Sequence, residues 1–133
     1  MSMKKTILLI DDEADIAEYI GAVLEDNGYR VVGAKPLDPI IQRVRDEKPD
    51  LVVLDVMMPQ RSGFSIYREL RLRPDTKHLP VILISAMATE REIQEKGMAA
   101  FFDESDIAMP EGFIEKPVRI PALIETVASL LSG

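Results

Sequence analysis

The stretch Leu51-Val52-Val53-Leu54-Asp55-Val56-Met57-Met58-Pro59 sets one carboxylate, Asp55, at the end of an almost wholly apolar run. Continuous runs of valine and leucine are typical of strands buried on both faces of a parallel sheet. Open α/β folds bind their ligands at the carboxyl edge of such strands. A carboxylate can also end a strand because it caps a following turn or helix, and for Asp55 alone both interpretations stay open.

A second apolar run, Ile7-Leu8-Leu9-Ile10, ends in the same way, with Asp11 and Asp12. If both runs are neighbouring parallel strands, their carboxyl ends lie at the same edge of the sheet. The repetition favours a ligand site over two independent capping residues. We therefore predict that Asp11, Asp12 and Asp55 meet in one pocket.

Composition limits the class of protein before any motif is interpreted. The chain has 133 residues, which suits one domain, and its formal charge of -7 argues against a general nucleic-acid-binding surface. The absence of cysteine excludes disulfides and thiol catalysis, and the single histidine, His78, leaves little for a zinc site. No stretch approaches the roughly 18 apolar residues of a membrane span, and residues 1–5 lead into a strand without a signal peptide. We expect a cytoplasmic protein.

Short apolar runs alternate with amphipathic segments along the chain, which is typical of a parallel sheet wrapped by helices. Right-handed crossovers then favour an α/β fold with a doubly wound, flavodoxin-like, five-stranded parallel sheet in the order 2-1-3-4-5, flanked by five helices. The predicted strands are residues 6–10, 29–34, 51–55, 81–85 and 112–115, and the predicted helices are residues 15–27, 38–47, 63–72, 89–100 and 120 onward.

In that order the first and third strands are neighbours, which brings the three acids together. Three carboxylates in one pocket repel one another unless a cation neutralises them. Oxygen ligands suit Mg²⁺, with Mn²⁺ as an alternative ion. Ser85 ends the fourth strand with a hydroxyl and Lys116 follows the fifth with an ammonium, and these two groups suit the oxygens of a phosphoryl group.

These motifs resemble the response-regulator receiver domain of bacterial two-component signalling, of the CheY-like superfamily, over nearly the whole chain. They are the acidic pair, Asp55 with Pro59 and Gly63 after it, Ser85 with the small residue Ala86, and Lys116-Pro117. The resemblance implies that Asp55 accepts a phosphoryl group from a histidine kinase. It further implies that the protein is not an enzyme but a phosphoacceptor that assists its own phosphorylation and dephosphorylation. It also implies that Asp12, Asp55 and the Met57 carbonyl bind Mg²⁺ directly, Asp11 mostly through water, and that Ser85 and Lys116 hold the phosphoryl oxygens.

Three further positions take expected roles from the same resemblance. Met57 and Met87 stand two residues beyond Asp55 and Ser85, where receivers tune dephosphorylation, and two apolar side chains there predict slow loss of phosphate. Phe113, three residues before Lys116, is the expected switch aromatic, which turns inward as Ser85 and Ala86 move. An ordinary core aromatic is the alternative interpretation of Phe113.

The chain departs from the receiver pattern in an insertion at about residues 101–111 of the single domain 1–133. It is either a tolerated surface loop or, through Phe101 and Phe102, a segment that packs on the domain or anchors a partner. Four arginines near the third helix are interpreted as a solvated face: Arg61, Arg68, Arg71 and Arg73.

The expected partners are a sensor histidine kinase or phosphotransfer protein and a downstream protein target that the sequence leaves unnamed. Direct binding to nucleic acid or membrane is not expected, and the protein should be a monomer or a phosphorylation-dependent homodimer. A phosphatase of the haloacid dehalogenase type needs a second acid where Met57 stands, which argues against that enzyme class. The remaining alternative is a phosphorylation-independent interaction module with the receiver fold.

Overall fold

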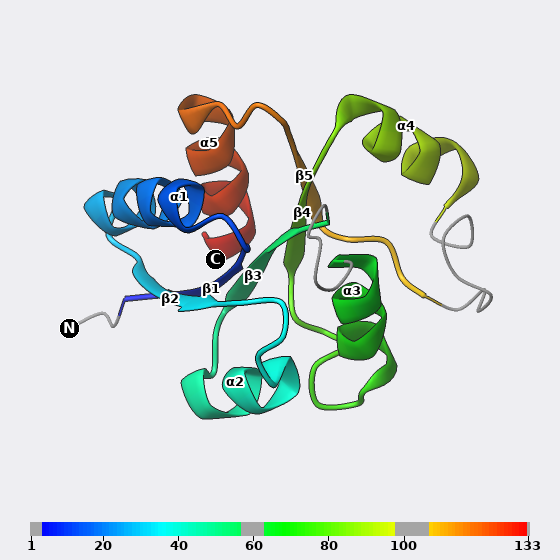
Figure 1. The fold of residues 1–133 in the computed structure, drawn as a ribbon, viewed down its shortest axis with the longest axis horizontal. Helices are drawn as coiled ribbons and strands as arrows, with labels where there is room; N and C mark the ends of the chain where they lie inside the picture. Colours follow the sequence, from blue (N-terminus) through cyan, green and yellow to red (C-terminus); the bar gives the residue numbers. More distant parts are fainter. Residues whose placement is uncertain (1–3, 57–62, 98–106, 133) are drawn as a thin grey trace.

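The computed structural model describes residues 4–56, 63–97 and 107–132, and the side chains of residues 87–89 lie outside that description. Within these ranges a five-stranded parallel sheet runs in the order β2-β1-β3-β4-β5, as predicted. Helices alternate with the strands along the chain (Figure 1). The elements are β1 (Thr6–Ile10), α1 (Ala14–Asp26), β2 (Arg30–Ala34), α2 (Ile40–Glu47), β3 (Leu51–Asp55), α3 (Gly63–Leu72), β4 (Val81–Ser85), α4 (Met87–Lys96), β5 (Gly112–Glu115) and α5 (Ile120–Leu131).

The helices cover both faces of the sheet, so the three inner strands are buried on each side. Every residue of β1, β3 and β4 is buried, whereas the edge strands β2 and β5 are partly exposed. Helices α1 and α5 pack on one face, and α2, α3 and α4 contribute to the cluster on the other. This burial explains why the inner strands consist of continuous apolar runs.

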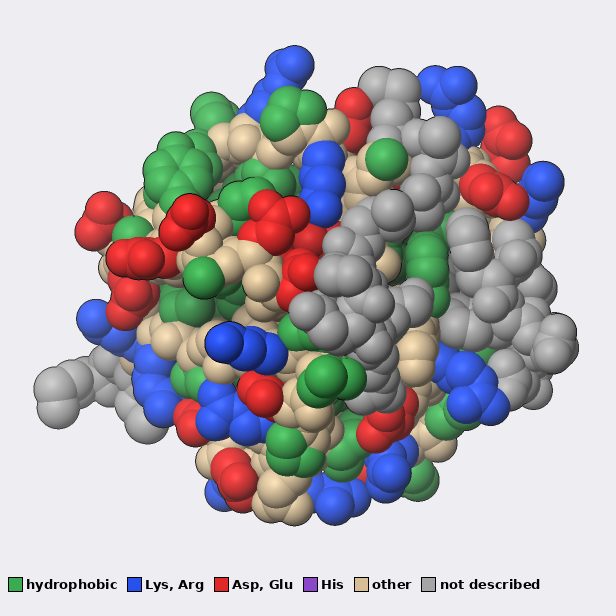
Figure 2. All heavy atoms as spheres, viewed as in Figure 1, with side chains coloured by type: hydrophobic (Ala, Val, Ile, Leu, Met, Phe, Trp, Pro, Cys, Tyr) green, Lys and Arg blue, Asp and Glu red, His purple; other side chains and the backbone are tan. Residues whose placement is uncertain are grey.

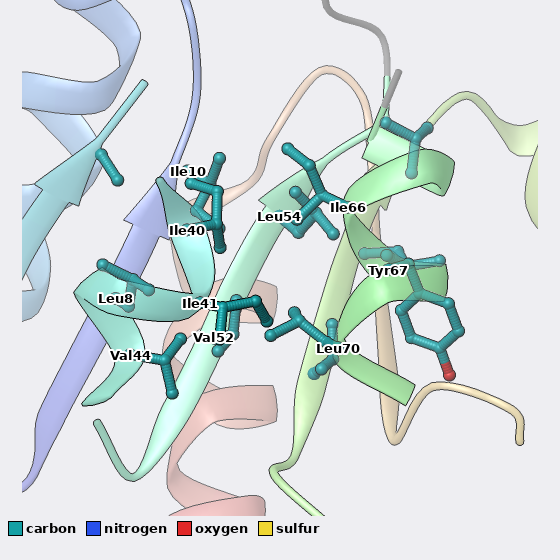
Figure 3. Close-up of a cluster of buried hydrophobic side chains, with 14 of the residues drawn as sticks. Leu8, Ile10, Ile40, Ile41, Val44, Val52, Leu54, Ile66, Tyr67 and Leu70 are labelled. Carbon is teal, nitrogen blue, oxygen red and sulfur yellow. The ribbon is translucent and has the colours of Figure 1, made fainter. Parts of the chain in front are cut away.

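Figure 3 shows the cluster beneath α2 and α3, where apolar side chains of both helices lie on the strands. Their spacing of three or four residues puts them on one side of each helix. From α2 come Ile40, Ile41 and Val44, from α3 come Ile66, Tyr67 and Leu70, and from the sheet come Leu8, Ile10, Val52 and Leu54.

Several predicted boundaries were wrong by a few residues. Helix α2 begins at Ile40 and not at residue 38, because the Asp38 carboxylate accepts a bond of 2.9 Å from the Lys35 amide and holds a turn there. Helix α4 begins at Met87 and ends at Lys96, where Gly97 takes a φ of 74°. The predicted end of that helix, at residues 98–100, lies outside the described residues.

The insertion is described only in its last part, residues 107–111. Ile107 and Pro110 are buried, and Ile107 belongs to the cluster under α3 and α4. This part of the insertion therefore packs on the domain. Phe101 and Phe102 lie outside the described residues, so their predicted roles stay predictions.

The described helices include none long and apolar enough to cross a lipid bilayer.

Candidate functional site

Three carboxylates meet at the carboxyl edge of β1 and β3. The two strands are paired with Ile10 opposite Leu54, so Asp11, Asp12 and Asp55 emerge side by side. One oxygen from each of the three lies within 4.8 Å of the other two. The predicted pocket therefore forms, and its oxygen ligands suit a hard divalent cation such as Mg²⁺.

The electrostatics of this pocket disfavour three free charges. Asp55 is 1% exposed and Asp11 is 6% exposed. Burial raises the pKa of Asp11, and the neighbouring Asp55 and Asp12 raise it further, although the Glu13 amide, 2.9 Å from Asp11 Oδ1, opposes the shift. A bound cation would relieve both the burial and the repulsion.

Lys116 brings a positive charge to the same pocket. Its Nζ lies 3.0 Å from Asp55 Oδ2, and its side chain is one third exposed. The backbone sets this position, because the Lys116 amide donates to the Ser85 carbonyl at 2.9 Å and continues the β4–β5 ladder. The peptide bond between Lys116 and Pro117 is cis. One ammonium balances one of the three carboxylates, which leaves room for a divalent ion.

Two buried oxygens at this edge have no hydrogen-bond partner among the described residues: Asp12 Oδ1 and Ser85 Oγ. Leaving a buried polar group unsatisfied costs about 1–3 kcal/mol. Ser85 is fully buried at the end of β4, the strand next to Asp55. A metal ion at Asp12 and an anionic oxygen at Ser85 would satisfy both atoms, so the residues present fit Mg²⁺ together with a phosphoryl group.

The family of this chain is decided by comparison with known sequences. The sequence model of the response regulator receiver domain matches residues 7–128. The chain belongs to this family.

This receiver domain matches some relatives over nearly their whole length and others over only part of it. It is 31% identical over 128 residues to the phosphate regulon transcriptional regulatory protein PhoB of Escherichia coli, covering 96% of this chain and 55% of PhoB. It is 26% identical over 132 residues to the polar-differentiation response regulator DivK of Brucella anthropi, covering 97% of this chain and 98% of DivK. The receiver domain thus spans about half of one relative and nearly all of the other.

Solved structures agree with this assignment. The receiver domain of a signal transduction histidine kinase from Syntrophus aciditrophicus has a TM-score of 0.76 and 29% identity to this chain. The match covers 97% of this chain and 91% of that one. The strand order and the helix arrangement are therefore those of known receiver domains.

The structure describes only some of the remaining predicted site residues. Ala86 is exposed and directly precedes α4, and Phe113 is half-buried on β5, packed against the cluster under α3. Met87 starts α4, but its side chain lies outside the description, as does all of Met57. The predicted metal contact of the Met57 carbonyl and the tuning role of both methionines therefore stay predictions.

A cavity of about 260 Å³ opens beside the acidic pocket. Asp11, Asp55 and Lys116 line its polar side, and the exposed residues Ile16 and Tyr19 of α1 line its apolar side. This cavity lies between α1 and the segment after β5 and borders Asp55.

The interpretation of Arg71 as part of a solvated arginine face was wrong. Its side chain is 2% exposed, and it donates to Tyr67 Oη and to Glu111 Oε1. Arg71 stands four residues after Tyr67 and one after Leu70, on the buried side of α3, and this spacing was the available signal.

The pKa of Asp11 gives a prediction for the metal-free protein. Folding raises this pKa above its usual 3.8, so the stabilising contribution of protonated Asp11 is complete below pH 3.8 and is lost as the pH rises through the folded value. At pH 7 the ionised carboxylate is therefore unfavourable. We expect Asp11→Asn to stabilise the metal-free protein at pH 7, with the gain shrinking toward pH 3.8.

Urea unfolding at several pH values, with and without Mg²⁺, measures this effect. Mg²⁺ should reduce or reverse the gain, because it favours the ionised wild-type pocket. Asp75→Asn is the control: hydrogen bonding from Arg45 lowers the pKa of Asp75, so its neutralisation should not stabilise the protein. If Asp11→Asn is less stable than wild type at pH 7 without metal, the ionised Asp11 carboxylate is not unfavourable in the folded protein.

Proposed function

We propose that this receiver domain is a phosphoacceptor switch that takes a phosphoryl group on Asp55 with the help of Mg²⁺. The donor would be the phosphohistidine of a cytoplasmic sensor histidine kinase or phosphotransfer protein. The observation that supports this most is the buried Asp55 carboxylate, bonded to Lys116 at 3.0 Å and sharing its pocket with Asp11 and Asp12. No other substrate is needed, so the domain would be a switch and not an enzyme in the usual sense.

The proposed transfer is one displacement at phosphorus. A carboxylate oxygen of Asp55 forms a bond to phosphorus as the phosphorus–nitrogen bond of the phosphohistidine breaks. The electron pair of that bond returns to the imidazole, and Asp55 becomes an acyl phosphate. When bound, Mg²⁺ would neutralise charge on the phosphoryl oxygens, and Asp12, Asp55 and Asp11 are the described residues that would hold it.

Ser85 and Lys116 would bind the transferred group. The Ser85 hydroxyl is buried and has a donor proton that none of the described residues accepts. The Lys116 ammonium already lies against Asp55 and would shift its bond to a phosphoryl oxygen. Movement of Ser85 toward that oxygen is the proposed start of the surface change, with Phe113 on the adjacent strand as the expected responding aromatic.

The donor would reach Asp55 through the cavity beside α1. That helix exposes Ile16 and Tyr19, which are 40% and 58% exposed, at the mouth of the cavity. Acidic side chains also gather over α1 (Figure 2). The exposed acidic residues are Glu13, which precedes the helix, and Asp15, Glu18, Glu25 and Asp26 within it. We therefore propose a donor protein with an apolar contact framed by basic side chains.

Slow dephosphorylation is the first kinetic expectation. Met57 and Met87 offer neither an acid nor an amide to orient an attacking water, so the phosphorylated form should last minutes or longer. Intact-mass spectrometry after removal of a small phosphodonor measures the half-life. A half-life of seconds would contradict the expectation, and Met57→Asn, which adds an amide, should shorten it.

Beryllofluoride, a mimic of the phosphoryl group, tests the proposed site without a kinase. With Mg²⁺ present it should shift the backbone NMR signals of Ser85, Lys116 and Phe113. Asp55→Asn should lose these shifts, since the carboxylate that bears the mimic is gone. Unchanged spectra of the wild-type protein would refute the phosphoacceptor function and favour a phosphorylation-independent interaction module.

A further inference from the structure

We infer that Glu111, held by Arg71, is a positioning residue for phosphoryl transfer, because it fixes β5 on β4 and so sets the place of Lys116 beside Asp55. The role of Glu111 in phosphoryl transfer rests on the proposed function. Its role in holding the short edge strand β5 on β4 does not.

Strand β5 has little of its own to fix its register. It has four residues, pairs with β4 alone among the described strands, and buries one side chain, Ile114. A strand that slips by two residues along its neighbour moves by about 6.6 Å. Since Lys116 reaches Asp55 at 3.0 Å, such a slip would take the ammonium out of the pocket.

Glu111 holds the start of this strand with both its backbone and its side chain. Its amide donates to the Val81 carbonyl at 3.0 Å, and its Oε1 accepts the Val81 amide at 2.8 Å. Val81 is the first residue of β4, so Glu111 fixes where β5 begins to pair with β4. The next pair in this register is Gly112 opposite Ile82. The same register ends with Glu115 opposite Ser85, one residue before Lys116.

Arg71 in turn holds the Glu111 carboxylate from α3. The Arg71 NH2 group donates to Glu111 Oε1 at 2.6 Å. Its NH1 group donates to the carbonyls of Lys77 and Leu79 at 2.9 and 2.7 Å, and its Nε donates to Tyr67 Oη at 2.9 Å. A buried guanidinium with partners on several sides has few other positions, so it is a rigid anchor for Glu111.

Tyr67 attaches the same segment a second time, three residues earlier. Its hydroxyl donates to the Ala108 carbonyl, and its ring lies under the Arg71 guanidinium, 4.9 Å from ring centre to carbon. Residues 108–111 are thus fastened to α3 before β5 begins.

A double-mutant cycle tests whether Glu111 acts through Lys116. Beryllofluoride affinity with Mg²⁺ is measured by NMR titration for wild type, Glu111→Ala, Lys116→Ala and the double variant. We expect Glu111→Ala to weaken the affinity about tenfold in the wild-type background and by less than about twofold when Lys116 is already alanine. Equal losses in both backgrounds, or none in the wild-type background, would overturn the inference.

Two further variants separate positioning from general stability. Glu111→Gln keeps an oxygen that can accept the Val81 amide and should retain most of the affinity. Val44→Ala removes buried atoms of α2 from the apolar cluster that also contains Tyr67. It should therefore lower stability while leaving the affinity unchanged. Loss of affinity in Val44→Ala equal to that of Glu111→Ala would reduce the role of Glu111 to stability alone.

Amide hydrogen exchange and cross-strand NOEs keep this test distinct from a test of the proposed function. In Glu111→Ala, or in the shorter Glu111→Asp if the alanine variant does not fold, exchange of the Lys116 amide should accelerate and contacts between Gly112 and Ile82 should weaken, while Glu111→Gln should keep both near wild type. If wild type fails to bind beryllofluoride while these changes occur, the proposed function fails and the positioning of β5 stands. If wild type binds beryllofluoride and the exchange is unchanged, the inference fails.

Discussion

Lys116→Ala is expected to slow Mg²⁺-dependent phosphorylation by acetyl phosphate about 100-fold or more. The Lys116 ammonium lies 3.0 Å from Asp55 Oδ2 and would stabilise the charge on the transferred oxygens, and removing one such donor from a buried site typically costs this much. Intact-mass time courses measure the rate.

A matched lysine variant controls for the loss of charge. Lys96→Ala removes an exposed lysine of α4, whose side chain is 65% exposed, and should keep the wild-type rate. Lys116→Arg should recover little, because the wider guanidinium does not replace a point charge in this pocket. A rate for Lys116→Ala within a few-fold of wild type would show that the lysine does not serve the transfer.

Gly63→Ala is expected to lower the free energy of unfolding by about 3 kcal/mol or more. A Cβ at this position would lie 2.3 Å from the Asp55 carbonyl oxygen and 2.5 Å from the Val56 Cα. These are backbone atoms of Asp55 and Val56 at the end of β3, so relief of the clash would displace Asp55 itself. Urea unfolding measures the loss.

Gly33→Ala is the control for a glycine in the same fold. A Cβ there would meet no atom within 4 Å, so the substitution should change stability by no more than about 0.5 kcal/mol. If both variants unfold at the same urea concentration, the close approach of α3 to the end of β3 is not a constraint on the fold.

The fold was predictable because its central strands carry a strong and simple pattern. The continuous apolar runs at residues 7–10 and 51–54 occur where burial on both faces demands them, and the alternation with helices leaves one common topology. Helix ends were less predictable. The start of α2 depends on a turn held by Asp38, which competes locally with the helix, and no apolar pattern records such a competition.

The candidate site was predictable in the residues that end strands. Asp11, Asp55, Ser85 and Lys116 each stand beside an apolar run, and the strand order then brings them to one edge. The sequence pattern predicted that Lys116 and Asp55 lie at the same edge of the sheet, but it did not predict a direct bond between them.

Arg71 and Glu111 were not predictable in the same way. They are 40 residues apart, and their partners are mostly backbone carbonyls and amides. A sequence segment with several arginines also resembles a solvated surface in its composition. Such a contact depends on tertiary packing, which apolar periodicity does not encode. The part of the insertion at residues 107–111 is fixed to α3 by these contacts.

Phosphorylation of Asp55 is tested most directly by the mass of the protein after incubation with acetyl phosphate and Mg²⁺, for wild type and for Asp55→Asn. We expect one added phosphoryl group on wild type, its loss when Mg²⁺ is removed by EDTA, and no addition to Asp55→Asn. Phosphorylation of Asp55→Asn equal to that of wild type, or none of wild type while beryllofluoride also fails to bind, would contradict the proposed role of Asp55.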